Sequence, residues 1–156
     1  MINWKRVRPA AVLLALMVAG CDVGRGPAGV ETLAGSNAVR HYDPQQLALG
    51  QQVFEQHCAA CHGVSGEGAA NWRQRDAEGF FPPPPLNGSG HEWHHPTAML
   101  REMIRDGSPP GLGKMPAWDG ILSEQEIAAV VEWFQSRWPD PVYAAWYDMQ
   151  QRALGK

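Results

Sequence analysis

Two cysteines and a histidine lie within five consecutive residues, and this short run constrains the fold more than any other part of the chain. Cys58, Cys61 and His62 form the pattern Cys-x-x-Cys-His, which is the pattern of covalent haem attachment. Two thioether bonds at this spacing reach the two vinyl groups on one edge of a porphyrin, and the next residue offers an imidazole nitrogen to the iron. The run therefore predicts one covalently bound haem c, with His62 as an iron ligand.

Three other uses of a Cys-x-x-Cys pair compete with haem attachment. A thioredoxin-like redox pair belongs in a βαβ unit, and no strand pattern precedes Cys58. A zinc site needs a second pair of ligands, and His91 and His94 lie too far downstream for a zinc-finger spacing. A simple disulfide would suit an exported protein. Haem attachment is the interpretation that uses both cysteines and the histidine.

The N-terminus has the pattern of an export signal. Three basic residues in the first eight positions precede an apolar run from Ala10 to Ala19, as in secretory signals, and this run is too short to cross a bilayer. It ends in Val-Ala-Gly-Cys, which resembles a bacterial lipoprotein signal with Cys21 as the lipid-bearing first residue. The sequence predicts a signal peptide over residues 1–20 and a lipid anchor at Cys21; the alternative is a plain signal peptide.

The segment after the lipid-bearing cysteine has no apolar period. Residues 22–41 contain five glycine or proline positions, a composition that predicts a flexible tether over residues 21–41. Lipid at Cys21 would hold the following domain at the periplasmic side of the cytoplasmic membrane, or at the outer face of the cell membrane in a Gram-positive cell.

Charge excludes nucleic acid as a partner. The chain has 13 Lys and Arg residues against 16 Asp and Glu residues, and three of the basic residues precede residue 21. The remainder is acidic and carries no basic stripe, so it lacks the electrostatic footprint of a nucleic-acid-binding protein.

Helix signals flank the cysteine motif on both sides. Asp43 and Pro44 open a helix as N-cap and first helical residue. A capping box from Ser123 to Glu126 starts another, which Pro139 ends. The apolar stripe of this second helix comprises Ile127, Val130, Val131, Phe134 and Trp138. Each pattern predicts an amphipathic helix of a globular domain.

Glycine at position 50 predicts how the two flanking helices pack. Because a glycine lets a bulky partner approach closely, we expect Gly50 and Phe54 to lie against Val130, Trp133 or Phe134 of the other helix.

Two further helices complete the predicted domain. Pro96 and Gly107 bracket a middle helix over residues 97–105, and residues 139–156 add a C-terminal helical extension. No stretch alternates apolar and polar residues as strands do. The fold class is therefore all-α, with about four short helices and long loops around one haem.

Residues 42–138 resemble a class I c-type cytochrome. The shared order is a helix that ends in Cys-x-x-Cys-His, a proline-rich loop (residues 82–86), a middle helix, a Met-Pro loop and an amphipathic last helix. The resemblance implies the cytochrome c fold and a second axial iron ligand from the loop before the last helix, which here is Met115. The alternative is a loop methionine that packs over an open or histidine-ligated iron. Met99 and Met103 fall on the middle helix, where methionine more often fills a core.

The resemblance also implies roles around the haem. In the family a loop proline carbonyl accepts the ring N–H of the iron-bound histidine, and Pro85 is the predicted acceptor. Trp93 and Trp118 are predicted to lie beside the haem and to donate hydrogen bonds to its propionates. The alternative for each is packing in the core.

A histidine cluster follows the proline-rich loop. His91, His94 and His95, with Met99 and Met103 behind them, offer imidazole and thioether groups suited to copper. The alternative is a polar loop near the haem propionates.

The resemblance implies an electron carrier and no catalysis, because histidine and methionine fill both axial positions of the iron. The predicted function is a membrane-tethered monohaem cytochrome that exchanges single electrons with redox protein partners. Two alternatives stay open: an electron-transfer subunit of an oxidase or dehydrogenase complex, with a respiratory complex as its partner, and a copper-handling protein that uses the histidine cluster.

Overall fold

Helices form almost all of the regular structure in the computed structural model of the chain, which describes residues 29–32 and 37–155. The elements in chain order are strands β1 (Val30–Glu31) and β2 (Asn37–Ala38), helix α1 (Pro44–Val53), the π-helical turn η1 (Phe54–Cys58), helix α2 (Ala59–His62), the 3-10 turn η2 (Glu92–His94), and helices α3 (Thr97–Asp106), α4 (Glu124–Ser136) and α5 (Asp140–Ala153). The predicted all-α class is confirmed, while the short antiparallel strand pair was not predicted. Within the described residues, no helix has the length and apolar composition of a membrane span.

Both predicted helix starts are present. The Asp43 side chain accepts a hydrogen bond of 2.8 Å from the Gln45 N–H, ahead of Pro44 at the start of α1. The Ser123 N–H donates to the Glu126 carboxylate at 2.8 Å, and the Glu126 N–H donates to the Ser123 hydroxyl. These reciprocal bonds satisfy backbone donors that a helix end leaves without partners.

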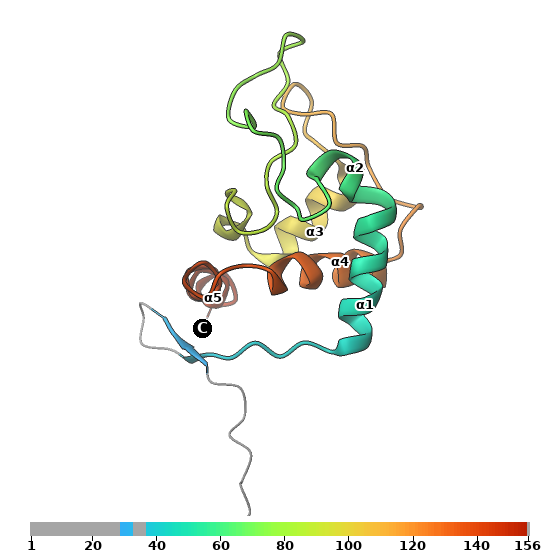
Figure 1. Cartoon of the computed structure of the whole chain (residues 1–156). Coiled ribbons are helices and arrows are strands. Elements are labelled where there is room, and N and C mark those ends of the chain that lie inside the picture. Colours follow the sequence, from blue (N-terminus) through green and yellow to red (C-terminus); the bar gives the residue numbers. More distant parts are fainter. Residues whose placement is uncertain (1–28, 33–36, 156) are drawn as a thin grey trace, which may run out of the picture.

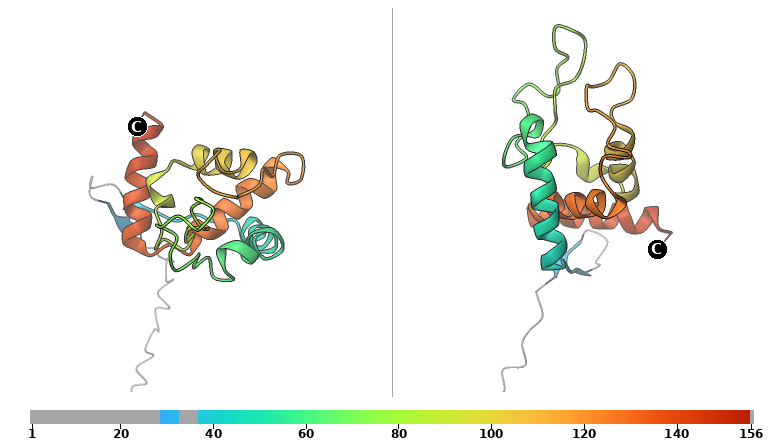
Figure 2. Two further views of the ribbon diagram at one scale, coloured as in Figure 1. Left: turned by 90° about the horizontal axis from the view of Figure 1, so that it is seen from above. Right: turned by 90° about the vertical axis from the view of Figure 1, so that its right-hand side faces the viewer.

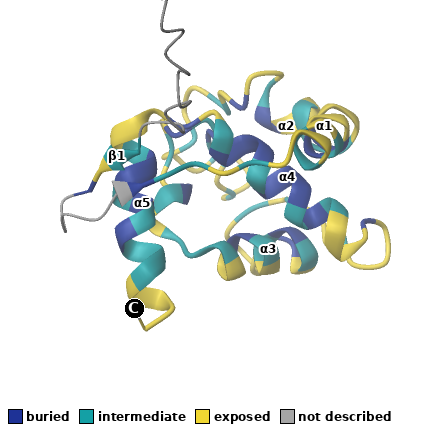
Figure 3. Ribbon diagram, turned by 90° about the horizontal axis from the view of Figure 1, so that it is seen from below, coloured by how far each residue is buried: buried dark blue, intermediate teal, exposed yellow. Residues whose placement is uncertain are grey.

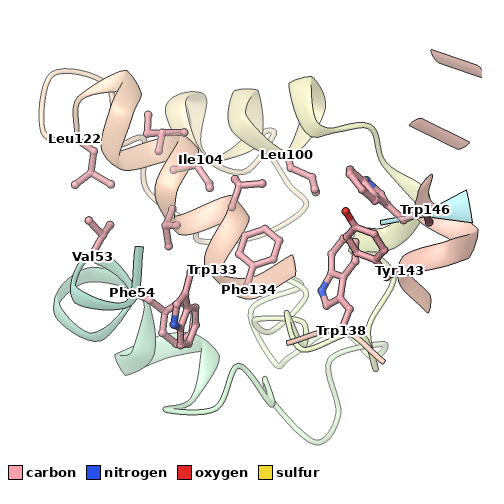
Figure 4. Close-up of a cluster of buried hydrophobic side chains, with 14 residues drawn as sticks. Val53, Phe54, Leu100, Ile104, Leu122, Trp133, Phe134, Trp138, Tyr143 and Trp146 are labelled. Atoms are coloured by element: carbon pink, nitrogen blue, oxygen red, sulfur yellow. The ribbon is translucent and has the colours of Figure 1, made fainter. Parts of the chain in front are cut away.

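Helix α4 runs through the centre of the domain, and α1 crosses it (Figures 1 and 2). Its buried side appears as the dark stretch in Figure 3, where Ile127, Val130 and Val131 are at most 1% exposed. The Phe54 ring lies 4.4 Å from the Trp133 ring between centroids, and Figure 4 shows the two side chains together. The predicted pairing of the two helices is therefore confirmed.

Residues 38–40 pack on the domain, which corrects the tether predicted to run through residue 41. Ala38 is 1% exposed. Arg40 donates to the carbonyl oxygens of Ser136 and Trp138 at 3.3 and 2.7 Å, and its guanidinium lies over the Tyr143 ring. These bonds satisfy carbonyls at the C-terminal end of α4 and explain why this segment is held there. Residues 1–28, with the predicted signal peptide and Cys21, lie outside the described residues.

Helix α5 packs against the part of the core next to the C-terminal end of α4. The Trp138 and Trp146 rings meet edge to face at 5.9 Å between centroids, and Tyr143 lies beside Trp146 (Figure 4). Trp146 is 7% exposed. The C-terminal extension therefore contributes aromatic side chains to the core of its own domain.

A buried carboxylate supports the loop between α2 and α3. Glu92 is 3% exposed, and one of its oxygens accepts a 2.9 Å hydrogen bond from the Gly88 N–H. The other oxygen has no hydrogen-bond partner among the described residues. Burial raises the pKa of Glu92 above its ordinary value, although nearby backbone N–H groups oppose this.

The helix crossing leads to a first prediction. A Cβ at Gly50 would lie 2.1 Å from the Ala129 carbonyl oxygen and 2.7 Å from the Trp133 Cβ. Gly50→Ala should therefore force α1 and α4 apart and lower the free energy of unfolding by about 3 kcal/mol. Denaturant unfolding measures this. Gln52→Ala, at an exposed position of the same helix, should stay within about 0.5 kcal/mol of the parent. Equal effects of the two changes would contradict the crossing.

A second prediction concerns pH. The folded state holds the Glu92 proton more tightly than the unfolded chain, so stability should fall as pH rises above the ordinary pKa of 4.5 and level off above the raised folded pKa. Glu92→Gln lacks this ionisation and should gain stability relative to the parent between pH 4 and pH 8. Unfolding at both pH values measures the gain, with Glu102→Gln on the exposed side of α3 as control. If the stability difference between Glu92→Gln and the parent is the same at both pH values, ionisation of Glu92 does not destabilise the folded state.

Candidate functional site

A cavity of about 780 Å³ lies next to the cysteine motif. It is bounded by the turn from Phe54 to His62, the proline-rich loop, helix α3 and the loop that carries Met115. Most of its lining side chains are apolar, and its volume is in the range of cofactor pockets, about 300–1,000 Å³. The cavity thus has the size and apolar character that a haem requires.

A change of helix type precedes the two cysteines. Helix α1 widens into the π-helical turn η1 at Phe54, and Cys58 is the last residue of that turn. Helix α2 then ends at His62, where Gly63 has a φ of +79°. The sequence predicted one helix running into the motif and did not predict the widened turn. Such turns are common at functional sites because they re-aim side chains that follow.

Both cysteines line the cavity, and they form no disulfide with each other. Burial raises the pKa of the Cys58 thiol to about 11, and the neighbouring Cys61 adds to the rise. Redox-active Cys-x-x-Cys pairs have a lowered thiol pKa. The environment of Cys58 is therefore opposite to that of a thioredoxin-like pair.

The His62 ring is oriented by a backbone carbonyl. His62 is 8% exposed, and its Nδ1 lies 2.8 Å from the Pro84 carbonyl oxygen. Donation from Nδ1–H to this oxygen leaves Nε2 available as a ligand. Burial lowers the pKa of His62, which outweighs the opposite effect of the Pro84 bond. The lowered pKa favours the neutral form of the ring, which is the form that binds a metal ion.

The carbonyl that accepts from His62 belongs to Pro84, so the prediction of Pro85 is wrong by one residue. The Pro85 carbonyl instead lies beside Gly90, where an added Cβ would come within 2.3 Å of its oxygen. Successive carbonyls of an extended proline segment point in different directions, and proline composition does not reveal which one faces the histidine.

Met115 lines the same cavity as His62. The base of its loop is closed by Ser108, whose N–H donates to the Met115 carbonyl at 3.0 Å and whose hydroxyl accepts from the Met115 N–H at 3.2 Å. Met99 and Met103 also line the cavity from α3, where the sequence predicted core filling. The structure thus brings three thioether groups to this cavity.

The two predicted tryptophan neighbours lie in different places. Trp118 lines the cavity, with its ring 5.1 Å from that of His57. Trp93 instead stacks on His94 at 3.6 Å between centroids and packs against the hydrophobic core. The structure therefore supports a place beside the haem for Trp118 and puts Trp93 outside the cavity lining.

The three clustered histidines do not converge. His91 and His95 line the cavity with ring centroids 5.4 Å apart, while His94 stacks on Trp93. In the part of the chain that the structure describes, no three His, Cys, Asp or Glu side chains form a group that could hold a metal ion. Burial, followed by the neighbouring histidines, lowers the pKa of His91 and of His95.

Sequence reasoning missed several lining groups. Glu92 faces the cavity from η2, and Arg73, Asp76 and Phe81 reach it from the long segment before the proline-rich loop. The closely spaced charges of that segment, next to a pair of phenylalanines, were the available signal. Their place at the cavity depends on a chain path that local patterns do not specify.

Comparisons with known proteins agree with this geometry. Residues 45–134 match the family described as cytochrome c oxidase, cbb3-type, subunit III. Cytochrome c6 of Tetradesmus obliquus is 37% identical over 84 residues, which cover 54% of this chain and 82% of that protein. The cbb3-type cytochrome c oxidase subunit FixP of Bradyrhizobium sp. (strain ORS 278) is 31% identical over 134 residues, which cover 79% of this chain and 42% of FixP.

The family implies a covalently bound haem c, and the residues present fit that group. The cavity brings together Cys58, Cys61 and His62, whose Nδ1 is already bonded to the Pro84 carbonyl, among apolar walls. The family match covers more than half of the chain, and the cytochrome c6 relative is covered over most of its length. The chain therefore belongs to the class I c-type cytochromes, the electron-transfer proteins that carry one covalently attached haem.

Proposed function

We propose that this cytochrome is a lipid-tethered carrier that passes single electrons between redox proteins outside the cytoplasm, with His62 and Met115 as the axial ligands. The observation that carries the proposal is the meeting of both side chains with both cysteines in one apolar cavity. A haem bound there supplies one-electron redox chemistry. Thioether bonds from Cys58 and Cys61 would hold its edge at the end of α2.

The protein's own groups determine what such a site can do. The Pro84 carbonyl fixes the orientation and tautomer of the His62 ring. A thioether from Met115 as a second iron ligand would leave no coordination site for dioxygen or peroxide and would raise the reduction potential relative to a second histidine. The apolar walls of the cavity would limit the contact of a bound haem with water. Together these features favour electron transfer over catalysis.

A second proposal keeps the same chemistry but makes the chain a subunit of an oxidase complex. Its support is the resemblance to FixP, named as a subunit of a cbb3-type cytochrome c oxidase, which extends over 79% of this chain. The chain spans less than half of FixP. Purification from membranes in mild detergent distinguishes the two: copurification with an oxidase supports the subunit, and isolation as a monomer supports the free carrier.

A third prediction tests the choice among the three methionines. Met115→Ala should abolish the weak red absorption band of ferric iron bound to a thioether, and should lower the reduction potential by on the order of 100 mV. Met99→Ala and Met103→Ala are matched controls from the same cavity and should keep the band. If the band is lost in one of these two variants and survives in Met115→Ala, the iron ligand is a methionine of α3 and not Met115.

A fourth prediction tests the tether. Cys21→Ser should release the cytochrome from the membrane fraction into the soluble extracytoplasmic fraction, because lipid attaches at that thiol. The haem spectrum should be unchanged, since Cys58 and Cys61 remain. Asp22→Asn, which keeps the cysteine, should stay with the membrane. Membrane association of Cys21→Ser equal to the parent would refute lipidation at this residue.

A further inference from the structure

Two loops that are far apart in the sequence lie together beside the haem cavity. We call residues 72–81 the insert loop and residues 108–116 the methionine loop. Both extend from the same end of the molecule, the insert loop in green and the methionine loop in orange at the top of Figure 1. Their backbones meet where the Phe81 N–H donates to the Leu112 carbonyl at 2.8 Å. Phe81, Leu112 and Met115 all line the cavity.

Arg75 connects the two loops through one guanidinium group. Its Nη1 donates to the Gly79 carbonyl in its own loop and to the Gly111 carbonyl of the methionine loop at 2.8 Å. The guanidinium also lies over the Phe81 ring, 4.3 Å from the centroid. Arg75 therefore holds the tip of the methionine loop against the residue that makes the backbone contact.

Lys114 makes the reciprocal connection from the methionine loop. Its Nζ lies 2.7 Å from a Glu78 carboxylate oxygen and 3.4 Å from an Asp76 carboxylate oxygen. The other Asp76 oxygen accepts from the backbone N–H groups of Glu78 and Phe80, both at 2.9 Å. These bonds, with Lys114, lower the pKa of Asp76. The two carboxylates that pair with Lys114 thus lie in a turn that is itself stabilised by the hydrogen bonds of Asp76.

The methionine loop depends on such support because of its composition. Its base is closed by the Ser108–Met115 bonds, but its tip contains Gly111 and Gly113, and Leu112 is 46% exposed. Glycine leaves the backbone many conformations, so ordering this tip carries an entropic cost. A thioether on a loosely ordered loop would leave the iron more readily.

We propose that Arg75 and Lys114 are positioning residues that keep the Met115 thioether in the haem cavity by fastening the methionine loop to the insert loop. The proposal rests on the proposed role of Met115 as an iron ligand. The guanidinium of Arg75 and the ammonium of Lys114 bond other groups of the two loops and not the Met115 side chain. Their effect passes through the backbone of residues 111–115.

The test uses imidazole as a competitor for the position that Met115 occupies in the ferric holoprotein. Arg75→Met/Lys114→Met removes both connections and keeps side chains of similar length. We expect its imidazole dissociation constant to fall about tenfold. Arg105→Met is the matched control, because it removes a partly exposed arginine of α3 whose guanidinium bonds Glu124 of α4 at 2.7 and 2.9 Å and neither of the two loops. Its imidazole affinity should change less than twofold.

A dissociation constant of the double variant equal to that of Arg105→Met would overturn the proposal. Met115→Ala separates this failure from failure of the ligand assignment, because it must lose the red thioether band if Met115 binds iron. Should the double variant not fold, Glu78→Gln removes the 2.7 Å ion pair without altering the methionine loop. It should raise imidazole affinity about twofold, and an unchanged affinity would count against Lys114.

Discussion

The close crossing of α1 and α4 is the constraint on which the rest of the structure depends. Gly50 permits the backbone of α1 to approach the Ala129 carbonyl and Trp133, and this approach places Phe54 against the Trp133 ring. The π-helical turn begins at Phe54 and ends at Cys58. A residue larger than glycine at position 50 would therefore move the haem-binding cysteines as well as weaken the core.

Two stretches of loop complete the site that this crossing positions: the insert loop with the proline-rich loop that follows it, and the methionine loop. The proline-rich loop supplies the Pro84 carbonyl that orients His62. The methionine loop brings Met115 to the same cavity, and the insert loop contacts it through Arg75 and Lys114. Loops carry the functional groups here while the helices provide a rigid base. The proposed chemistry follows from this division, because an apolar cavity lined by both His62 and Met115 suits electron exchange.

Segments outside the family match also belong to the folded domain. Helix α5 lies beyond residue 134, and Arg40 precedes residue 45, yet Arg40 bonds the carbonyl end of α4 and lies over Tyr143 of α5. A tether ahead of β1 would leave the domain at the α5 side, because β1 and β2 both contact α5. In Figure 1 the two loops beside the haem cavity extend from the opposite end, above α4. An anchor at one end and a haem at the other would leave the cavity accessible to redox partners.

The sequence by itself determined the haem motif, both capped helix starts and the Gly50 crossing, because each depends on residues close together or on one complementary pair of helix faces. Only the tertiary structure decided that Pro84 rather than Pro85 bonds His62, that His94 stacks on Trp93 away from His91, and that Glu92 is buried. It also decided that the insert loop reaches the methionine loop. These features depend on the paths of long loops, whose closure is set by contacts between distant residues and not by local hydrophobic or capping patterns.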